Sequence, residues 1–201
     1  MKKQLAMQLS KLKTVDLPQI KLEQYQTDSN IVAEILIIAD YNKDINNKIV
    51  VDLGCGNGIF GIGALSLGAK KVYFVDLDNN SINVTKINSK DFKNLEFFNC
   101  NISDFNKKVD TVIMNPPFGV QNRKADKKFL EKAFEISDKI YSIHKIESEK
   151  FIETISKEYG FKVLKIIPLN MQLKKSYNFH KKKMYKIGVG LWILSKNELY
   201  I

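Results

Sequence analysis

The sequence predicts a single doubly wound α/β domain, with helices on both faces of a mostly parallel sheet. Short apolar runs of strand length alternate with segments of helical periodicity along the chain. A glycine-rich turn at residues 52–58 follows the first compact apolar run. The length of 201 residues suits one domain with a substantial core. In such sheets ligands bind at the carboxyl ends of the strands.

Two helices are expected before the first strand. Leucines at helical spacing predict an amphipathic helix over residues 1–13. A second helix is expected over residues 30–40, with Asp28 or Ser29 as its N-cap. Within a single domain of residues 1–201, we expect residues 1–28 to supply the first helix and a segment that covers the ligand site. Residues 48–201 are expected to form the core sheet and its helices.

Strands and helices alternate in the rest of the chain. The strands are short runs rich in Val, Ile, Tyr and Phe, and the helices repeat apolar residues three and four positions apart. Gly68 and Gly160 end helices, and Asp78 caps one. The expected strands cover residues 48–52, 71–76, 96–100, 110–114, 140–144, 161–168 and 184–194. The expected helices between them cover residues 59–67, 81–91, 126–137 and 147–159.

Composition and charge narrow the class of protein. Hydrophobic residues make up 44% of the chain and charged residues 27%, an ordinary balance for a globular domain. No apolar run approaches the roughly 20 residues of a membrane span, and the N-terminus lacks a signal-peptide core. We therefore expect a cytoplasmic protein without membrane association. Cys55 and Cys100 lack a metal-binding spacing, so no metal is expected.

The net charge of +10 favours a polyanionic partner. Lysines supply almost all of the positive charge, since Arg123 is the only arginine. A polyanion is attracted over about one Debye length, roughly 8–10 Å in physiological salt. Nucleic acid is the obvious candidate, although charge alone does not identify it.

The glycine-rich turn has two interpretations. Gly56, Gly58 and Gly61 match G-x-G-x-x-G, and Asp76 lies 20 residues beyond Gly56, as in nicotinamide and flavin enzymes. The same turn, Asp-Leu-Gly-Cys-Gly-Asn-Gly, also fits the D-x-G-x-G-x-G loop typical of S-adenosylmethionine binding. In both cases missing side chains let the backbone approach the ligand, and Asp76 accepts ribose hydroxyls. A second motif, further along the sequence, favours S-adenosylmethionine over a nicotinamide or flavin cofactor.

That second feature is Asn115-Pro116-Pro117-Phe118, which follows an apolar run at residues 110–114. The prolines fix φ and lack an N–H, so their carbonyls stay free to accept hydrogen bonds. The Asn amide adds a donor and an acceptor, and the Phe ring offers a flat face for a base. This construction suits holding a planar amine while a group is transferred to it. A nicotinamide enzyme would not need it.

With both motifs considered, the chain resembles the methyltransferase-like protein 5 family, the small-subunit ribosomal RNA adenine-N6 methyltransferases of archaea and eukaryotes. The resemblance covers almost the whole chain. The Asn-Pro-Pro-Phe motif in its longer context is highly specific, and the glycine loop is moderately so. The matching segments are Leu-Glu-Gln-Tyr at 22–25 with Thr27, the glycine loop, Leu-Gly-Ala at 67–69, residues 112–119, Tyr-Ser-Ile-His-Lys at 141–145, and Phe-His-Lys-Lys-Lys at 179–183.

The resemblance implies a class I S-adenosylmethionine-dependent methyltransferase with a seven-stranded Rossmann-like sheet. Its cofactor would be S-adenosylmethionine, leaving S-adenosylhomocysteine as product, and its acceptor would be the N6 amine of an adenosine in RNA. Asp76 would hold the donor's ribose, and Asn101 with Ile102 would meet its adenine. The residues implied to bind the donor are Gln24, Thr27, Asp52, Gly54, Gly56, Asn57, Ile59, Asp76, Asn101, Ile102 and Asn115.

The same resemblance assigns catalytic positions to Asn115, Pro116, Pro117 and Phe118. Asn115 and the Pro116 carbonyl would accept the two amine hydrogens, and Phe118 would stack on the adenine. The target base must already be unpaired or leave its stack. Two positions depart from the family pattern: Gln26 stands where Pro is common, and Asn101 where Asp is common. They put the donor affinity in doubt, and not the type of reaction.

Two partners are expected. A basic segment between the last two strands suits RNA phosphates if the sixth strand runs parallel to the core strands. Its expected RNA-binding residues are Lys174, Lys175, Phe179, His180, Lys181, Lys182 and Lys183. Family members also work with the small zinc-binding activator of the tRNA methyltransferase 112 family. Residues 95–99 would be an edge strand open to strand addition, unless both Phe97 and Phe98 are buried under helices.

Alternative functions stay open at the level of sequence. Related Asn-Pro-Pro-aromatic enzymes methylate DNA adenine, guanine N2 or a protein glutamine, and the glutamine enzymes usually have Tyr where Phe118 stands. A nicotinamide-dependent oxidoreductase and a non-catalytic ribosome-assembly factor are the other classes considered. The intact glycine loop, Asp76 and Asn115 argue against a non-catalytic protein.

Overall fold

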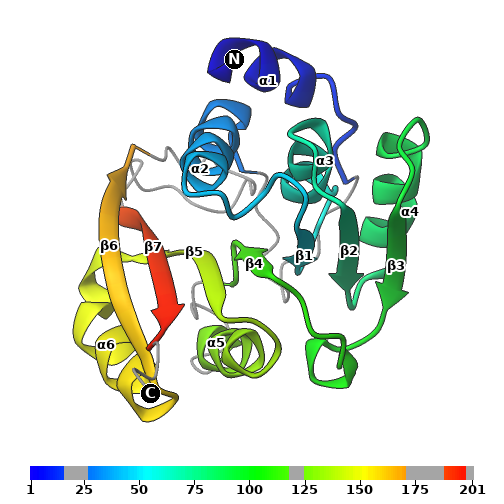
Figure 1. The fold of residues 1–201 in the computed structure, drawn as a ribbon. Helices are drawn as coiled ribbons and strands as arrows, with labels where there is room; N and C mark the ends of the chain where they lie inside the picture. The colour runs from blue at the N-terminus through cyan, green and yellow to red at the C-terminus, as the bar shows by residue number, and fades with distance from the viewer. Residues whose placement is uncertain (16–26, 118–124, 171–187, 198–201) are drawn as a thin grey trace, which may run out of the picture.

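A computed structural model describes residues 1–15, 27–117, 125–170 and 188–197, and Figure 1 shows its fold. Seven strands form one sheet in the order β3-β2-β1-β4-β5-β7-β6. The strands are β1 (Ile49–Leu53), β2 (Lys71–Asp76), β3 (Leu95–Asn99), β4 (Thr111–Met114), β5 (Lys139–Lys145), β6 (Phe161–Leu169) and β7 (Val189–Lys196). The α-helices are α1 (Lys2–Leu9), α2 (Ser29–Tyr41), α3 (Ile59–Ser66), α4 (Asn79–Asn88), α5 (Ala125–Ile136) and α6 (Glu149–Glu158). Two 3₁₀ turns are η2 (Ile102–Asp104) and η3 (Ile146–Ser148).

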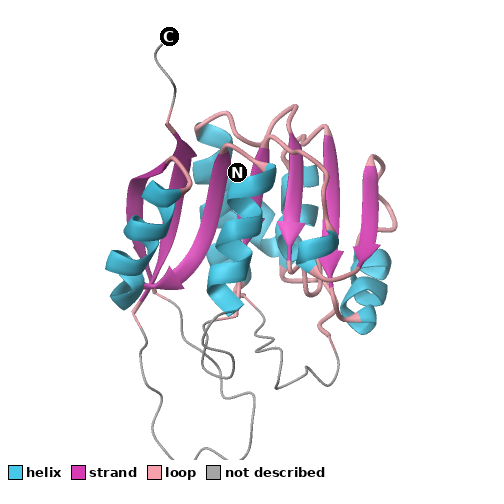
Figure 2. Cartoon of the chain, turned by 90° about the horizontal axis from the view of Figure 1, so that it is seen from below, coloured by secondary structure: helices cyan, strands magenta, loops and turns pink. Residues whose placement is uncertain are grey.

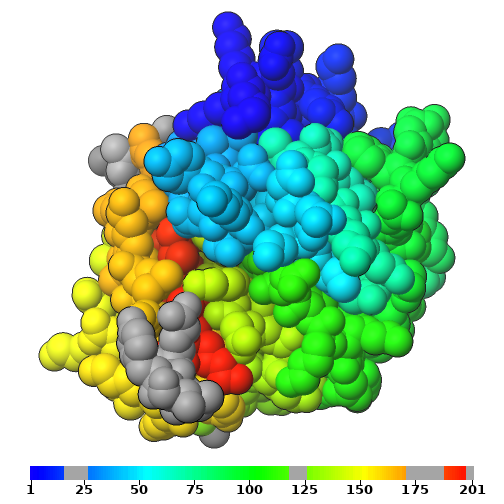
Figure 3. Space-filling view, viewed as in Figure 1, coloured from blue at the N-terminus to red at the C-terminus, as the bar shows by residue number. Residues whose placement is uncertain are grey.

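Helices cover both faces of the sheet, as expected for a doubly wound domain. Helices α1 to α4 contribute to one hydrophobic cluster and α5 and α6 to the other. Figures 1 and 3 show α1 lying over α2 and α3, where Leu5, Ala6 and Leu9 are buried. The N-terminal helix is therefore part of the core. None of the helices in the described residues is long and apolar enough to cross a membrane.

All strands run parallel except β7, which pairs antiparallel with both β5 and β6. Because β7 is antiparallel to both neighbours, β6 runs parallel to β5 and to the core strands. The sixth strand therefore has the direction on which the prediction of an RNA-binding segment depended. Lys145 of β5 and Leu169 of β6 both pair with Val189 of β7. The described ends that flank residues 171–187 thus lie at the carboxyl edge of the parallel strands, toward which the arrowheads point in Figure 2.

Most expected boundaries are confirmed within two or three residues. Residues 71–76 match β2 at both ends, and Asp28 caps α2 by accepting the Asn30 N–H at 2.9 Å. Helix α4 begins at Asn79, two residues earlier than expected, because Asp78 caps it directly by accepting from Asn80 N and Ser81 N. The expected strand 184–194 is seen from Val189 to Lys196, and residues 184–187 lie outside the described part.

The first helix is shorter than the leucine spacing predicts, ending at Leu9 and not at residue 13. The reason is a tertiary contact. The Lys13 N–H donates to Asn88 Oδ1 at 2.9 Å, and Asn88 Nδ2 donates to the Lys13 carbonyl at 3.0 Å. Both backbone groups of Lys13 are bonded to a side chain on α4, so its N–H does not continue the helical hydrogen bonding.

Helix α3 approaches the sheet so closely that only glycine fits at one position. A Cβ on Gly61 would lie 2.2 Å from Cε1 of Phe74, a buried ring on β2. A contact this short forces the ring or the helix to move.

We predict that Gly61→Ala lowers the free energy of unfolding by about 1–3 kcal/mol through overpacking. Urea unfolding followed by circular dichroism measures the change. The matched control is Gly160→Asn, where φ is +75° and nothing lies within 4 Å of the added Cβ. Asn tolerates the left-handed conformation, so its cost should stay below about 1 kcal/mol. Equal effects of the two variants would contradict this account of α3 packing.

Candidate active site

The parallel register brings three loops to one edge of the sheet. Leu53 of β1 pairs with Val75 of β2, and Asp52 of β1 pairs with Ile113 of β4. Gly54 and Asn115 directly follow β1 and β4, and Asp76 is the last residue of β2, so the three residues lie at the same edge. The two motifs that the sequence singled out meet at this point.

The glycine loop after β1 has a left-handed backbone at three positions. The φ angles are +76° at Gly54, +56° at Gly56 and +80° at Gly58. A Cβ at Gly58 would lie 2.6 Å from Cγ2 of Thr85 on α4, so this position needs glycine for space as well. The Thr85 hydroxyl donates to the Gly56 carbonyl at 2.9 Å. Thr85 therefore supports the loop, although no sequence motif pointed to it.

Asp76 fixes the loop from the end of β2. Its Oδ2 accepts the Gly56 N–H at 2.8 Å and its Oδ1 accepts the Asp78 N–H at 2.9 Å. Burial raises the pKa of Asp76, and these two backbone hydrogen bonds partly offset the rise. Each carboxylate oxygen keeps a second lone pair, so the predicted bonds from ribose hydroxyls remain compatible with this geometry.

Asp52 lies beneath the loop at the end of β1. It is 1% exposed, and its Oδ2 accepts the Gly61 N–H at 2.8 Å, which ties β1 to the first turn of α3. Burial raises the pKa of Asp52 to about 8, and the nearby Asp76 carboxylate adds to the rise. Its position supports the loop from below.

Asn57 links the loop to the N-terminal segment. Its Nδ2 donates to the Lys13 carbonyl at 3.1 Å, and Asn88 Nδ2 donates to the Asn57 carbonyl at 3.0 Å. The Asn57, Asn88 and Lys13 backbone and side-chain groups thus form one polar cluster. Sequence reasoning missed Lys13 and Asn88, because no pattern links positions 75 residues apart.

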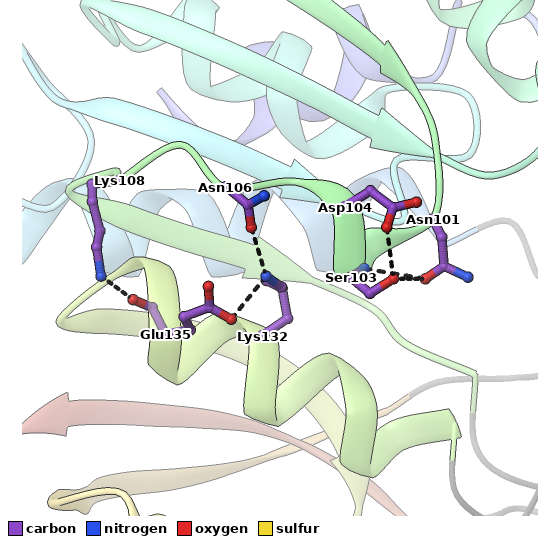
Figure 4. Close-up of polar contacts among 7 residues, drawn as sticks. All are labelled: Asn101, Ser103, Asp104, Asn106, Lys108, Lys132 and Glu135. Carbon is purple, nitrogen blue, oxygen red and sulfur yellow. Dashed lines mark hydrogen bonds and ion pairs between the residues drawn. The ribbon is translucent and has the colours of Figure 1, made fainter.

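Asn101 and Ile102 lie on the neighbouring loop after β3. Asn101 Oδ1 accepts from the Ser103 N–H and from the Ser103 hydroxyl, both at 3.1 Å, and so caps η2 (Figure 4). These bonds hold the loop that carries Asn101 and Ile102, and the contact of the two residues with an adenine ring stays a prediction.

The same loop is tied to α5. Lys132 Nζ donates to Asn106 Oδ1 at 3.2 Å and pairs with Glu135 at 2.8 Å, and Lys108 Nζ donates to the Glu135 carbonyl (Figure 4). The Lys132 side chain is 8% exposed. These contacts hold the loop that carries Asn101 against α5, whose contacting residues lie 26 and 27 positions further along the chain.

Leu77 is a residue that sequence reasoning missed. It directly follows Asp76 and is 55% exposed despite its apolar side chain. Asn99 Nδ2 donates to the carbonyls of Asp76 and Leu77 at 3.1 and 3.0 Å, which fixes the backbone there. An exposed apolar side chain on a rigid backbone beside Asp76 is suited to contact a planar ring. Its position immediately after the acidic residue was the signal available in the sequence.

Asn115 is the central residue of the second motif. Its Nδ2 donates to Thr27 Oγ1 at 2.9 Å, while its Oδ1 is buried and has no hydrogen-bond partner among the described residues. Pro116 is buried and Pro117 is half-buried. A buried amide oxygen without a partner costs about 1–3 kcal/mol, so it is a candidate acceptor for a ligand group.

Several predicted site residues lie outside the described residues. They are Gln24, Phe118, Lys174, Lys175, Phe179, His180, Lys181, Lys182 and Lys183. The structure brings together Thr27, Asp52, Gly54, Gly56, Asp76 and Asn115 at the carboxyl edge. In the described ranges there is no group of three or more His, Cys, Asp or Glu side chains able to hold a metal ion.

Comparison with known proteins agrees with this geometry. Residues 28–140 match the methyltransferase small domain family. The rRNA N(6)-adenosine-methyltransferase METTL5 of Danio rerio is 38% identical to the chain, over 86% of this chain and 87% of the relative. The corresponding Drosophila melanogaster protein is 33% identical, over 87% of both. The chain belongs to the METTL5 family. An uncharacterized protein of Methanocaldococcus jannaschii is similar over 97% of the chain at 36% identity and 94% of its own length.

Solved methyltransferase structures have a similar fold. The crystal structure of a candidate RNA methyltransferase from Pyrococcus horikoshii matches with a TM-score of 0.91 and 45% identity, over 97% of each chain. The magnesium protoporphyrin IX methyltransferase of Synechocystis, solved with bound S-adenosylmethionine, matches at a TM-score of 0.65 and 16% identity, over 83% of this chain and 78% of that one. This second likeness shows the fold alone. Family membership decides between the two interpretations of the glycine loop in favour of a methyltransferase.

We predict that the stability advantage of the natural chain over Asp52→Asn falls as pH rises from about 5 to 8, and levels off above about 8. The Asp52 pKa is raised to about 8 in the folded state and is near 3.9 in the unfolded state. Between these values the folded chain holds a proton that the unfolded chain has lost, so its unfolding free energy drops with pH. Denaturant unfolding of both proteins at several pH values measures this difference. A difference that rises with pH would contradict the raised pKa.

Proposed function

We propose that this METTL5-family chain transfers the methyl group of S-adenosylmethionine to the N6 amine of an adenosine in ribosomal RNA, with small-subunit rRNA as the substrate. The observation that carries the proposal is the Oδ1 of Asn115 at the carboxyl edge of the sheet, which is buried and has no hydrogen-bond partner in the described part of the chain. An adenine amine has two hydrogens to donate, and this oxygen is an acceptor held next to the glycine loop. The names of the relatives support RNA adenine over DNA adenine, guanine or glutamine as the acceptor.

The residues present fit S-adenosylmethionine, which supplies an electrophilic methyl group on a sulfonium. The left-handed glycines at 54, 56 and 58 leave backbone accessible, and Asp76 retains lone pairs for two hydroxyls. Leu77 and Ile102 offer apolar surface for the adenine end, and Asn101 Nδ2 can donate to a ring nitrogen. Gln24 and Asn57 complete the donor set taken from the family resemblance.

The chain's own contribution to the reaction is positioning. The amine lone pair of adenine is delocalised into the ring, so the nitrogen is a poor nucleophile. Acceptors at Asn115 Oδ1 and the Pro116 carbonyl would hold its two hydrogens and direct the lone pair outward. Phe118 would stack on the base. Well-oriented reactants lower the barrier by several kcal/mol, on the order of 7–11 in the best cases. The methylated nitrogen carries a positive charge and is acidic, so it releases one proton to water after the transfer and no strong general base is required.

RNA binding is assigned to the basic segment between β6 and β7, with Lys174, Lys175, Phe179, His180, Lys181, Lys182 and Lys183. The described ends of this segment, Asn170 and Gly188, flank the carboxyl edge where Asn115 lies. Lysines there would contact phosphates and give an affinity that falls steeply with salt. The overall charge of +10 supports the same partner.

A second partner, the small zinc-binding activator of the tRNA methyltransferase 112 family, is assigned to β3. The two edge strands of the sheet differ. Strand β6 has an irregular register between Val163 and Lys165 and carries Pro168, features that block strand addition. Strand β3 pairs with β2 in unbroken register and contains no proline. Phe97 packs against Phe74 and Phe98 against Tyr73. Both rings are half-buried, so they are neither fully buried under helices nor fully exposed at the edge.

We predict that Asn115→Ala abolishes methyl transfer, with a rate at least about 100-fold lower, because the amine loses its acceptor. Donor affinity, measured by calorimetry with S-adenosylhomocysteine, should change by less than about threefold. The control is Asn83→Ala, an exposed position on α4. Retained turnover in Asn115→Ala would sink the assignment. In cells, ribosomal RNA from a deletion strain should lack one N6-methyladenosine by mass spectrometry, and complementation with Asn115→Ala should not restore it.

We predict that the activator subunit slows amide hydrogen exchange on β3 at Leu95, Phe97 and Asn99. The Cys100 N–H donates to the Asp76 carbonyl and the Asn94 carbonyl accepts from Val72, so alternate amides point to β2 and these three point to the open edge. Exchange mass spectrometry with and without the activator measures the protection. Peptides from β6 are the internal control and should not change. Protection of β6 without β3 would place the partner elsewhere.

A further inference from the structure

The function proposed above does not use the hydrogen bond between Asn115 and Thr27. We infer that the Thr27 hydroxyl positions the Asn115 amide for catalysis, so that Thr27 is a positioning residue for methyl transfer. This inference rests on the proposed function of the same site. It assigns to Thr27 a task other than the donor contact expected from sequence.

Thr27 is held in place by elements far from the Asn-Pro-Pro turn. It directly precedes Asp28, the N-cap of α2, whose carboxylate accepts the Asn30 N–H at 2.9 Å. The helix that follows is anchored by side chains with no exposure, among them Val32 and Leu36. Thr27 itself is 5% exposed. Its hydroxyl is therefore a fixed and nearly dry hydrogen-bonding group.

The Asn115 amide is planar, so fixing one end fixes the other. Nδ2 donates to Thr27 Oγ1 at 2.9 Å, and this holds Oδ1 on the opposite side of the amide, where it is buried and unpartnered among the described residues. An amide turned over would present its NH₂ to the incoming amine, placing a donor against a donor. With Thr27 accepting from Nδ2, the amide meets the amine with its acceptor already aimed, and little reorganisation is needed during the reaction.

For Thr27 to position the amide, its hydroxyl is required, and a side chain of the same shape without a hydroxyl does not suffice. Valine has nearly the same shape as threonine but cannot accept from Nδ2, which would leave a buried amide N–H₂ without its partner. The amide would then rotate or shift to find another partner. A displacement of about 1 Å at a reacting group can cost on the order of 100-fold in rate.

The test compares Thr27→Val with Thr27→Ser, using the full chain with its activator where one is needed. Single-turnover methyl transfer at saturating donor and RNA should fall about 10- to 100-fold in Thr27→Val. Thr27→Ser restores the hydroxyl and should rescue the rate to within about threefold. S-adenosylhomocysteine affinity by calorimetry should change by less than about threefold in both variants. The unrelated control is Thr154→Val on the exposed face of α6.

A second readout is independent of activity. The side-chain NH₂ signals of Asn115 in an ¹⁵N NMR spectrum should shift in Thr27→Val and return in Thr27→Ser, whether or not the protein methylates RNA. If the natural chain shows no methyl transfer, the proposed function fails while this measurement still reports on the hydrogen bond. An unchanged single-turnover rate in Thr27→Val overturns the inference and leaves the proposed function intact. A loss of rate that is seen at subsaturating donor and disappears at saturating donor also overturns it, because Thr27 would then be only a donor contact. If Thr27→Val unfolds, Thr27→Ala against Thr27→Ser gives the same comparison.

Discussion

The parallel pairing of β1 with β2 on one side and β4 on the other is the constraint on which the site depends. It sets Leu53 beside Val75 and Asp52 beside Ile113, so the three following loops leave the sheet at one edge. Parallel strands in a doubly wound sheet align their carboxyl ends, and the strand order turns back between β1 and β4. Asn115 follows Gly58, the last glycine of the loop, by 57 positions in the sequence, and the aligned strand ends bring the two motifs to the same edge. The strand register therefore determines which residues meet at the candidate site.

Buried carboxylates give the glycine loop its shape and its electrostatics. Asp76 accepts from Gly56 inside the loop, and Asp52 accepts from Gly61 in the first turn of α3, so carboxyl groups fix the loop and the helix that follows it. Burial raises the pKa of both acids, which means that their negative charges are costly in the free protein. A cationic sulfonium ligand nearby would favour the ionised forms.

Contacts from the N-terminal segment complete both halves of the site. Lys13 is bonded to Asn57 and Asn88 beside the glycine loop, and Thr27 is bonded to Asn115 beside the acceptor motif. Helix α1 is packed into the same core as α2 and α3. The residues that follow α1 and precede α2 therefore contact the candidate site, and the two helices that hold them are packed into the core.

The sequence by itself determined the alternation of strands and helices, the caps at Asp28 and Asp78, and the two motifs with their chemistry. These are local properties: hydrophobic period, capping side chains and the φ preferences of glycine and proline act within a few residues. Only the tertiary structure decided that Lys13 is bonded to Asn88, that Asn101 caps the turn that follows it, and that Asn115 is bonded to Thr27 across 88 positions. Such contacts depend on where packed helices deliver a side chain, and no spacing rule along the chain encodes that position.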